Sequence, residues 1–229
     1  MSTPRRDFLG WLGASALAGT APAMLLGAPP VRPSLRTPDA RSPRVSANGW
    51  DMSWVGRIRG RHRVVFDAPD LSEGDPILRA VVWGKQYQEV FGTEPSKTSR
   101  VLVLRHLGIH FAMNDAYWAR FPIASEHGFL DAAGRGLTVN PVRAPRAEVP
   151  EPFRSMTLEA FQESGGIVVA CQLALAHYVV PRYVAGGLSE TAAMAAAARD
   201  VLPGVIMQPS GIFAVSVAQE ADCKYVPVS

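Results

Sequence analysis

The sequence predicts a doubly wound α/β domain built on a mainly parallel sheet of about five strands. Two observations lead to this fold class. Short apolar runs alternate with helical patterns from His62 onward, which is the order of elements in parallel-sheet proteins. In addition, the run "GIVVAC" at residues 166–171 does not alternate with polar residues, as expected of a strand that is buried on both faces.

The first predicted unit is strand, helix, strand. Residues 62–68, "HRVVFDA", form the first strand. The helix after it is expected to have Asp75 as its N-cap and Pro76 at its first position, and to stop at Gly92. Residues 100–106, "RVLVLRH", form the second strand.

The middle of the domain has weaker patterning. Asn114 can cap a short helix, whereas residues 123–152 are rich in Pro, Gly and Arg and are given no regular structure. Residues 155–166 are expected to form a capped helix that ends at its two glycines. The strand at 166–171 follows directly.

The last third contains clear helix starts and stops. Residues 173–187 are helix-like until Pro181 interrupts them, and residues 188–201 form a second helix with Ser189 as its cap. A strand, a helix that starts at Ser210 and a closing strand complete the sheet, at residues 204–209, 211–221 and 224–228.

The segment before the domain has the pattern of an export leader. Arg5 and Arg6 precede Phe8 and a mildly apolar stretch, diluted by glycines, that ends at a small-residue cleavage site at 21–23. The pattern is similar to a twin-arginine signal, which predicts export through the Tat machinery to the periplasm and removal of the signal. An uncleaved membrane anchor is the weaker alternative, because a spanning helix needs ~20 consecutive apolar residues.

The predicted organisation is a twin-arginine signal peptide at 1–28, a flexible Pro/Arg-rich tether at 29–49 and the α/β domain at 50–229. The signal peptide carries a net charge of +1 and the tether +3, which leaves −1 for the domain out of the total of +3. The domain is therefore not basic, and we expect no nucleic-acid partner.

Five polar or reactive residues are predicted to share one edge of the sheet. The carboxyl ends of parallel strands lie along a common edge, and ligands bind in the crevice outside it. Asp67, Arg105, His106, Cys171 and Ser210 each lie at or just after such a strand end. We therefore predict a site with Cys171 and His106 as catalytic residues and with Arg105, Ser210 and Asp67 as substrate-binding residues.

Cys171 has three interpretations. A disulfide with Cys223 suits an exported protein, but the two residues are predicted at opposite edges of the sheet, too far apart to be bridged. A small buried hydrophobe is what a free cysteine usually is. A reactive thiol is favoured by position, because the amides at the start of a helix stabilise a thiolate.

The neighbouring residues also have alternatives. Arg105 could bind an anion such as a sulfur oxyanion, or could pair with an aspartate, and Ser210 could donate to a bound anion or only cap its helix. His106 could serve as a proton donor or base beside Cys171. His106 and His110 would align as metal ligands only on a helix, and Gly108 interrupts that stretch, so neither a metal nor another cofactor is predicted.

The last third of the chain resembles the DsrE/DsrF-like family. The resemblance rests on "TLEAFQESGGIVVACQLALA" and "LPGVIMQPSGIFAVSVAQEADCKYV", which give a helix, a glycine-started strand ending in Cys, a Leu-Pro-Gly-Val strand, Pro-Ser-Gly and a Tyr-bearing last strand. Upstream, "HRVVFDAPD" resembles the first strand of exported members. The resemblance covers most of the domain, strongly in the last third and weakly between Ile109 and Pro152.

The resemblance implies flavodoxin-like α/β/α layers, a homo-oligomer, and a cysteine that carries sulfur as a persulfide, a position that only Cys171 matches. The implied partners are a sulfur donor or acceptor protein, or a small sulfur compound. The proline-rich middle segment departs from the short members of the family. The alternative is a non-catalytic periplasmic module that binds a small ligand or a partner and in which Cys171 is structural.

Overall fold

The computed structural model describes residues 48–146 and 153–228. The predicted signal peptide and residues 29–47 of the predicted tether lie outside the described residues, as do residues 147–152 of the proline-rich segment. In the described part of the chain, no helix is both long enough and apolar enough to cross a membrane.

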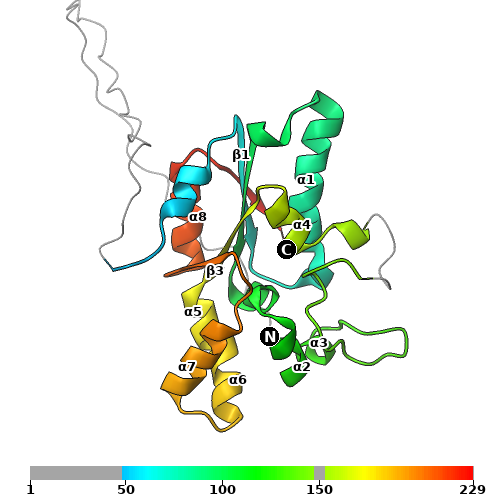
Figure 1. The fold of residues 1–229 in the computed structure, drawn as a ribbon, viewed down its shortest axis with the longest axis vertical. Coiled ribbons are helices and arrows are strands. Elements are labelled where there is room, and N and C mark those ends of the chain that lie inside the picture. Colours follow the sequence, from blue (N-terminus) through cyan, green and yellow to red (C-terminus); the bar gives the residue numbers. More distant parts are fainter. Residues whose placement is uncertain (1–47, 147–152, 229) are drawn as a thin grey trace, which may run out of the picture. The chain divides into compact units, whose positions relative to one another are not determined.

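A five-stranded, all-parallel sheet forms the centre of the domain, and the strand order is β4-β3-β2-β1-β5 (Figure 1). The predicted strands are all present. They are β1 (His62–Ala68), β2 (Thr98–Leu104), β3 (Ile167–Cys171), β4 (Val205–Gln208) and β5 (Lys224–Pro227).

Helices connect every pair of consecutive strands. The α-helices are α1 (Asp75–Phe91), α2 (Asp115–Arg120), α3 (Ile123–Glu126), α4 (Leu158–Glu163), α5 (Gln172–Ala174), α6 (Val180–Ala185), α7 (Glu190–Arg199) and α8 (Gly211–Glu220). The 3₁₀ turns are η1 (Ser53–Arg57), η2 (Ser72–Gly74), η3 (Pro95–Lys97), η4 (His106–Ala112) and η5 (Phe153–Ser155), and η6 (Leu175–Val179) is a π-helix.

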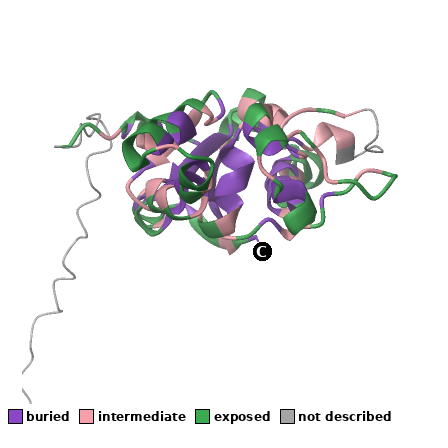
Figure 2. Cartoon of the chain, turned by 90° about the horizontal axis from the view of Figure 1, so that it is seen from below, coloured by how far each residue is buried: buried purple, intermediate pink, exposed green. Residues whose placement is uncertain are grey.

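Two apolar clusters pack on opposite faces of the sheet. The larger one joins the sheet to α1, α4, α6 and α7, and the smaller one joins it to α8 and to the buried Trp54 of η1. Figure 1 shows α8 on one side of the strands and α1 and α4 on the other, and Figure 2 shows the buried residues concentrated around the sheet. Because helices cover both faces, the domain is a doubly wound, flavodoxin-like α/β/α fold, as predicted.

Polar side chains cap the helices at the predicted positions. Asn114, Ser189 and Ser210 accept hydrogen bonds from the backbone N–H groups of Tyr117, Ala192 and Phe213, at the starts of α2, α7 and α8. Each bond satisfies a backbone donor that has no partner within its own helix.

Three local expectations are wrong. Gly74, not Asp75, is the N-cap of α1: its φ of 94° suits a glycine, and the Asp75 carboxylate instead accepts a hydrogen bond from Arg79. The second strand ends at Leu104, two residues early, because Arg105 and His106 turn away into η4. Pro181 does not stop its helix, because the wider π-turn of η6 precedes it and the helical stretch continues through α6.

The segment at 123–152, for which no regular structure was expected, contains the short helix α3 and turns in its described part. These turns pack against α1 and α4 and supply Phe129 and Val142 to the larger apolar cluster.

Candidate functional site

The carboxyl edge of the sheet brings together the five residues that the sequence predicts for the site. Asp67 is the sixth residue of β1, Arg105 follows β2, and Cys171 ends β3 directly opposite Gln208 at the end of β4. Ser210 follows β4 and caps α8. Since all strands run the same way, these positions lie along one edge of the sheet.

The edge contains the point at which the fold changes direction. The connection after β3 runs through α5, α6 and α7, which belong to the apolar cluster on one face, whereas the connection after β4 runs through α8 on the other face. In doubly wound sheets the crevice between two such strands is the usual ligand site. Cys171 and Gln208 end the two strands at which the connections change face.

Asp67 and Arg105 form a two-point ion pair at the ends of β1 and β2. Arg105 Nε lies 2.6 Å from Asp67 Oδ1, and Arg105 Nη2 lies 2.8 Å from Asp67 Oδ2. The Asp67 side chain is 6% exposed and that of Arg105 is 30% exposed. Both Asp67 oxygens thus bind and orient Arg105, while part of the guanidinium remains exposed to solvent.

Tyr225 of β5 completes this group. Its hydroxyl donates a hydrogen bond to Asp67 Oδ2 at 2.9 Å. The bond to Asp67 raises the pKa of Tyr225, and the same carboxylate, by its hydrogen bond, is the main cause of a raised pKa of Arg105. The tyrosine therefore stays neutral and the arginine charged at any physiological pH. In the described part of the chain no acceptor is bonded to Arg105 Nη1, which leaves that nitrogen available to an anion.

The start of α8 packs directly on the Arg105 stem. A Cβ atom placed on Gly211 would lie 2.5 Å from Arg105 Cβ and 2.7 Å from Arg105 Cδ, so only glycine fits at this position. The hydroxyl of the preceding Ser210 accepts the N–H of Phe213 at 3.1 Å. Ser210 thus acts as the helix cap, and Gly211 brings α8 into contact with Arg105.

Cys171 caps the helical stretch that begins at Gln172. Its Sγ accepts a hydrogen bond from the backbone N–H of Ala174 at 3.3 Å. The residue is 6% exposed and belongs to the larger apolar cluster, but it also lies within electrostatic range of Arg105, since its thiolate contributes to the raised pKa of that arginine. The sulfur atom therefore combines limited solvent access with a backbone N–H donor and a nearby cationic side chain.

His106 lies at the same edge, and its backbone is strained. It has a φ of 50°, which is unfavourable for a residue other than glycine. The imidazole is exposed and packs edge-on against Tyr178 of η6, with ring centroids 4.7 Å apart. Among the described residues no hydrogen bond joins His106 to Cys171. No direct contact therefore supports the predicted role of His106 as a base.

His110 is buried, whereas His106 is exposed. The His110 Nδ1 is hydrogen-bonded to the Tyr117 hydroxyl at 2.8 Å, and burial lowers the pKa of His110 to about 3. Within residues 48–146 and 153–228, no group of three or more His, Cys, Asp or Glu side chains could hold a metal ion.

Both cysteines are free. Cys223 lies immediately before β5 and therefore at the opposite edge of the sheet from Cys171. Burial raises the pKa of the Cys223 thiol to about 11. The raised pKa favours the protonated form of Cys223, which makes this thiol an internal reference for Cys171.

Sequence reasoning missed three residues of this edge: Tyr225, Gly211 and Gln208. Gln208 is fully buried, and its amide N–H donates to the Asp51 carbonyl oxygen at 2.7 Å while Oε1 has no partner. The glycine in "QPSG" was the one available signal, because a glycine at the first position of a helix often marks a close approach. Tyr225 and Gln208 gave none, since their partners are distant in the sequence.

Comparison of the chain with protein-family models, with curated proteins and with solved structures found no match. The resemblance to the DsrE/DsrF-like family therefore stays a prediction from the quoted sequence pattern.

Proposed function

We propose that this chain is an exported DsrE-like protein that carries sulfur as a persulfide on Cys171. The observation that supports the proposal best is the position of Sγ. It lies at the carboxyl edge of the sheet, accepts the Ala174 N–H and is within electrostatic range of Arg105. An N–H donor and a cation beside a cysteine are the type of surroundings that reactive thiols use, and the thiolate is the attacking species in sulfur transfer.

The proposed step is a thiolate exchange. The Cys171 thiolate attacks the terminal sulfur of a donor persulfide, R–S–SH. The new S–S bond forms on Cys171 as the donor S–S bond breaks, and the donor leaves as the thiolate R–S⁻, so that charge and atoms balance without an added oxidant. The reverse exchange passes the sulfur to an acceptor thiol.

Arg105 supplies the positive charge in this proposal. It stabilises the anionic sulfur of the thiolate and of the persulfide, and Asp67 fixes the orientation of the guanidinium by accepting two hydrogen bonds. Because Asp67 is held by Arg105 and Tyr225, it is a positioning residue and takes no proton from the substrate.

Large apolar side chains next to the site support a macromolecular sulfur donor or acceptor. Leu173, two residues after Cys171, is 65% exposed, and Ile212 and Phe213, in the first turn of α8, are 72% and 40% exposed. Apolar residues that stay uncovered beside a functional site are typical of docking surfaces. The twin-arginine pattern supports the periplasm as the compartment of this exchange, and the resemblance to the family supports a homo-oligomer.

The experiment is to incubate the full chain with glutathione persulfide and to record its intact mass. Wild type and Cys223→Ser are expected to gain one sulfur atom, and Cys171→Ser is expected to gain none. Cys223→Ser is the matched control because it removes the other buried thiol without touching the carboxyl edge. An adduct that persists in Cys171→Ser would contradict the proposal.

The second candidate function is a binding module in which Cys171 is only packing. The 6% exposure of Cys171 favours it, and Arg105 would then bind an anion for recognition alone. If wild type gains no sulfur and Cys171 resists alkylation in the native protein, the module is the better description.

A further inference from the structure

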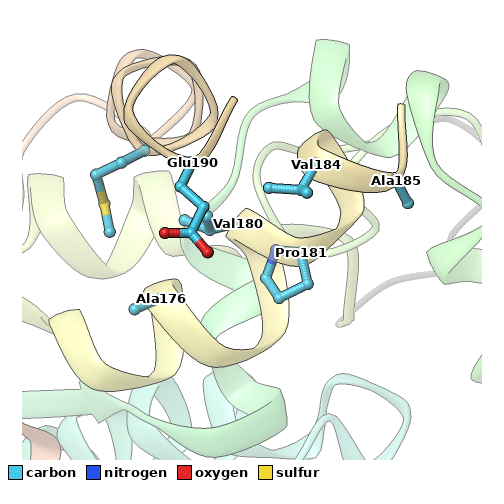
Figure 3. A pocket seen from close by; sticks show the side chains of 7 residues that line it. Ala176, Val180, Pro181, Val184, Ala185 and Glu190 are labelled. Atoms are coloured by element: carbon cyan, nitrogen blue, oxygen red, sulfur yellow. The ribbon is translucent and has the colours of Figure 1, made fainter. Parts of the chain in front are cut away.

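A groove with one acidic group lies between α6 and α7, apart from the carboxyl-edge residues described above (Figure 3). The cavity has a volume of about 530 Å³. This is within the range of pockets that hold small organic ligands, roughly 300–1,000 Å³. The groove is therefore large enough for a small molecule.

The walls of the groove are apolar. Val180, Pro181 and Val184 of α6 form one side, and Met194 of α7 faces them. Val184 is 37% exposed, so this side is accessible from solvent. Burying a short hydrocarbon chain here would remove apolar surface from water on both partners, which favours binding.

Glu190 is the single charged residue in the lining. Figure 3 shows its carboxylate pointing from α7 toward the α6 side of the groove. It lies in the first turn of α7, where the helix dipole stabilises a negative charge. Within the described residues it has no hydrogen-bond or ion-pair partner. Glu190 is exposed, so water hydrates its carboxylate, and a cation in the groove would give it a charged partner.

Arg182, which adjoins a lining residue in the sequence, already has a carboxylate partner. Arg182 follows Pro181, and both of its terminal nitrogens contact Glu126 of α3, at 2.6 and 3.2 Å. Arg182 therefore leaves the Glu190 charge uncompensated.

The backbone beside the groove contains an irregular turn. In η6 the N–H of Val180 bonds to the carbonyl oxygen of Leu175, and Pro181 has no N–H to donate. The carbonyl of Ala176, which is a lining residue, thus lacks both the i+4 donor of an α-helix and the i+5 donor of a π-helix.

From these contacts we infer that the groove between α6 and α7 binds a small organic ammonium with an apolar tail. The ammonium pairs with Glu190, and the tail lies against Val180, Pro181 and Met194. A primary ammonium has three donors and no acceptor, which matches a lining whose one charged group is a carboxylate. The inference uses none of the residues of the persulfide proposal, so either can fail without the other.

The test is calorimetric titration of the full chain with hexylammonium chloride, with hexan-1-ol as the neutral probe of similar size. Wild type is expected to bind hexylammonium saturably at one site and to bind hexan-1-ol at least about tenfold more weakly. Glu190→Gln is expected to lose about tenfold in affinity, as for one charge-assisted hydrogen bond. Glu163→Gln, an exposed glutamate of α4 outside the groove, is the matched control and should bind as wild type.

A second variant tests the apolar wall. Val184→Ser keeps Glu190 and lies on the exposed side of α6, so the fold is preserved while hexylammonium binding weakens severalfold. No saturable hexylammonium binding, equal affinity for the two probes, or unchanged affinity in Glu190→Gln would each overturn the inference.

Discussion

Gly211 is the residue on which the position of Arg105 depends most directly. An added Cβ would lie 2.5 Å from the Arg105 Cβ, closer than side-chain atoms approach in proteins. We expect Gly211→Ala to lower the free energy of unfolding by about 1–3 kcal/mol, as overpacking does, and to displace α8 from the arginine. Urea denaturation measures the loss.

Gly56→Ala is the control for this change, because a Cβ on Gly56 meets no atom within 4 Å. It should leave stability within about 0.5 kcal/mol of wild type. Equal effects of the two substitutions would show that α8 does not pack on Arg105 as described.

The ion pair of Asp67 and Arg105 is the second feature at the scale of single residues. Asp67→Asn removes the charge that orients the arginine and replaces one of the two oxygens that accept from Arg105 and Tyr225 with an amide donor. We expect a loss of about 2 kcal/mol in the free energy of unfolding, because both partners are largely withdrawn from water. Thermal and urea unfolding measure it.

Asp75→Asn is the matched comparison, since it breaks a pair with Arg79 whose side chains are 47% and 45% exposed. Surface pairs of this kind contribute little, so we expect a change of less than about 1 kcal/mol. If the two aspartate substitutions cost the same, the burial of the Asp67 pair has no energetic role.

At the scale of elements, the start of α8 depends on the Ser210 cap. Ser210→Ala removes the acceptor of the Phe213 N–H and should cost about 1 kcal/mol of stability. Ser210→Asp restores an acceptor and should recover that stability. Persulfide formation in Ser210→Asp at wild-type yield would show that Ser210 is a cap alone, whereas a selective loss of persulfide formation would contradict that role.

The packing of η4 on α2 makes stability depend on pH. Burial lowers the pKa of His110 to about 3 from its ordinary value of 6.5. Between these values the unfolded chain binds a proton at His110 that the folded chain does not. Stability is therefore complete above about pH 6.5 and falls as the pH drops toward 3, by at most about 1.4 kcal/mol per pH unit from this group.

Urea midpoints measured from pH 7 to pH 4 check this slope. His110→Gln keeps an acceptor for Tyr117 but cannot titrate, so its stability should change less over this range than that of wild type. His177→Gln, at an exposed position of η6, should retain the wild-type slope. An unchanged slope in His110→Gln would contradict the assignment.

For the whole molecule, the sequence allowed the sheet and the shared edge to be predicted. Parallel strands that are buried on both faces appear in the sequence as apolar runs. Caps such as Asn114 and Ser189 mark helix starts, because their hydrogen bonds are local. The rule that parallel strands end along one edge then brought Asp67, Arg105 and Cys171 together.

The remaining features depend on contacts that no local pattern encodes. Tyr225 reaches Asp67 across 158 positions, and Gly211 at the start of α8 meets the arginine that follows β2. The continuation of the helix through Pro181 needed the π-turn of η6, which the identity of the proline alone does not reveal. Local chemistry predicted the elements, and tertiary packing decided which side chains meet.

The fold of the whole domain places the two thiols at opposite edges of the sheet, and we expect their reactivities to differ for this reason. The direct measurement is the rate at which iodoacetamide alkylates each cysteine of the native full chain at pH 8, followed by peptide mass spectrometry. We expect Cys171 to react at least about tenfold faster than Cys223, whose pKa of about 11 keeps it protonated. The double variant Asp67→Asn/Arg105→Gln, which removes the charged pair together, should slow Cys171 alone. Alkylation of both cysteines at one common rate, equal to the rate of global unfolding, would contradict the account.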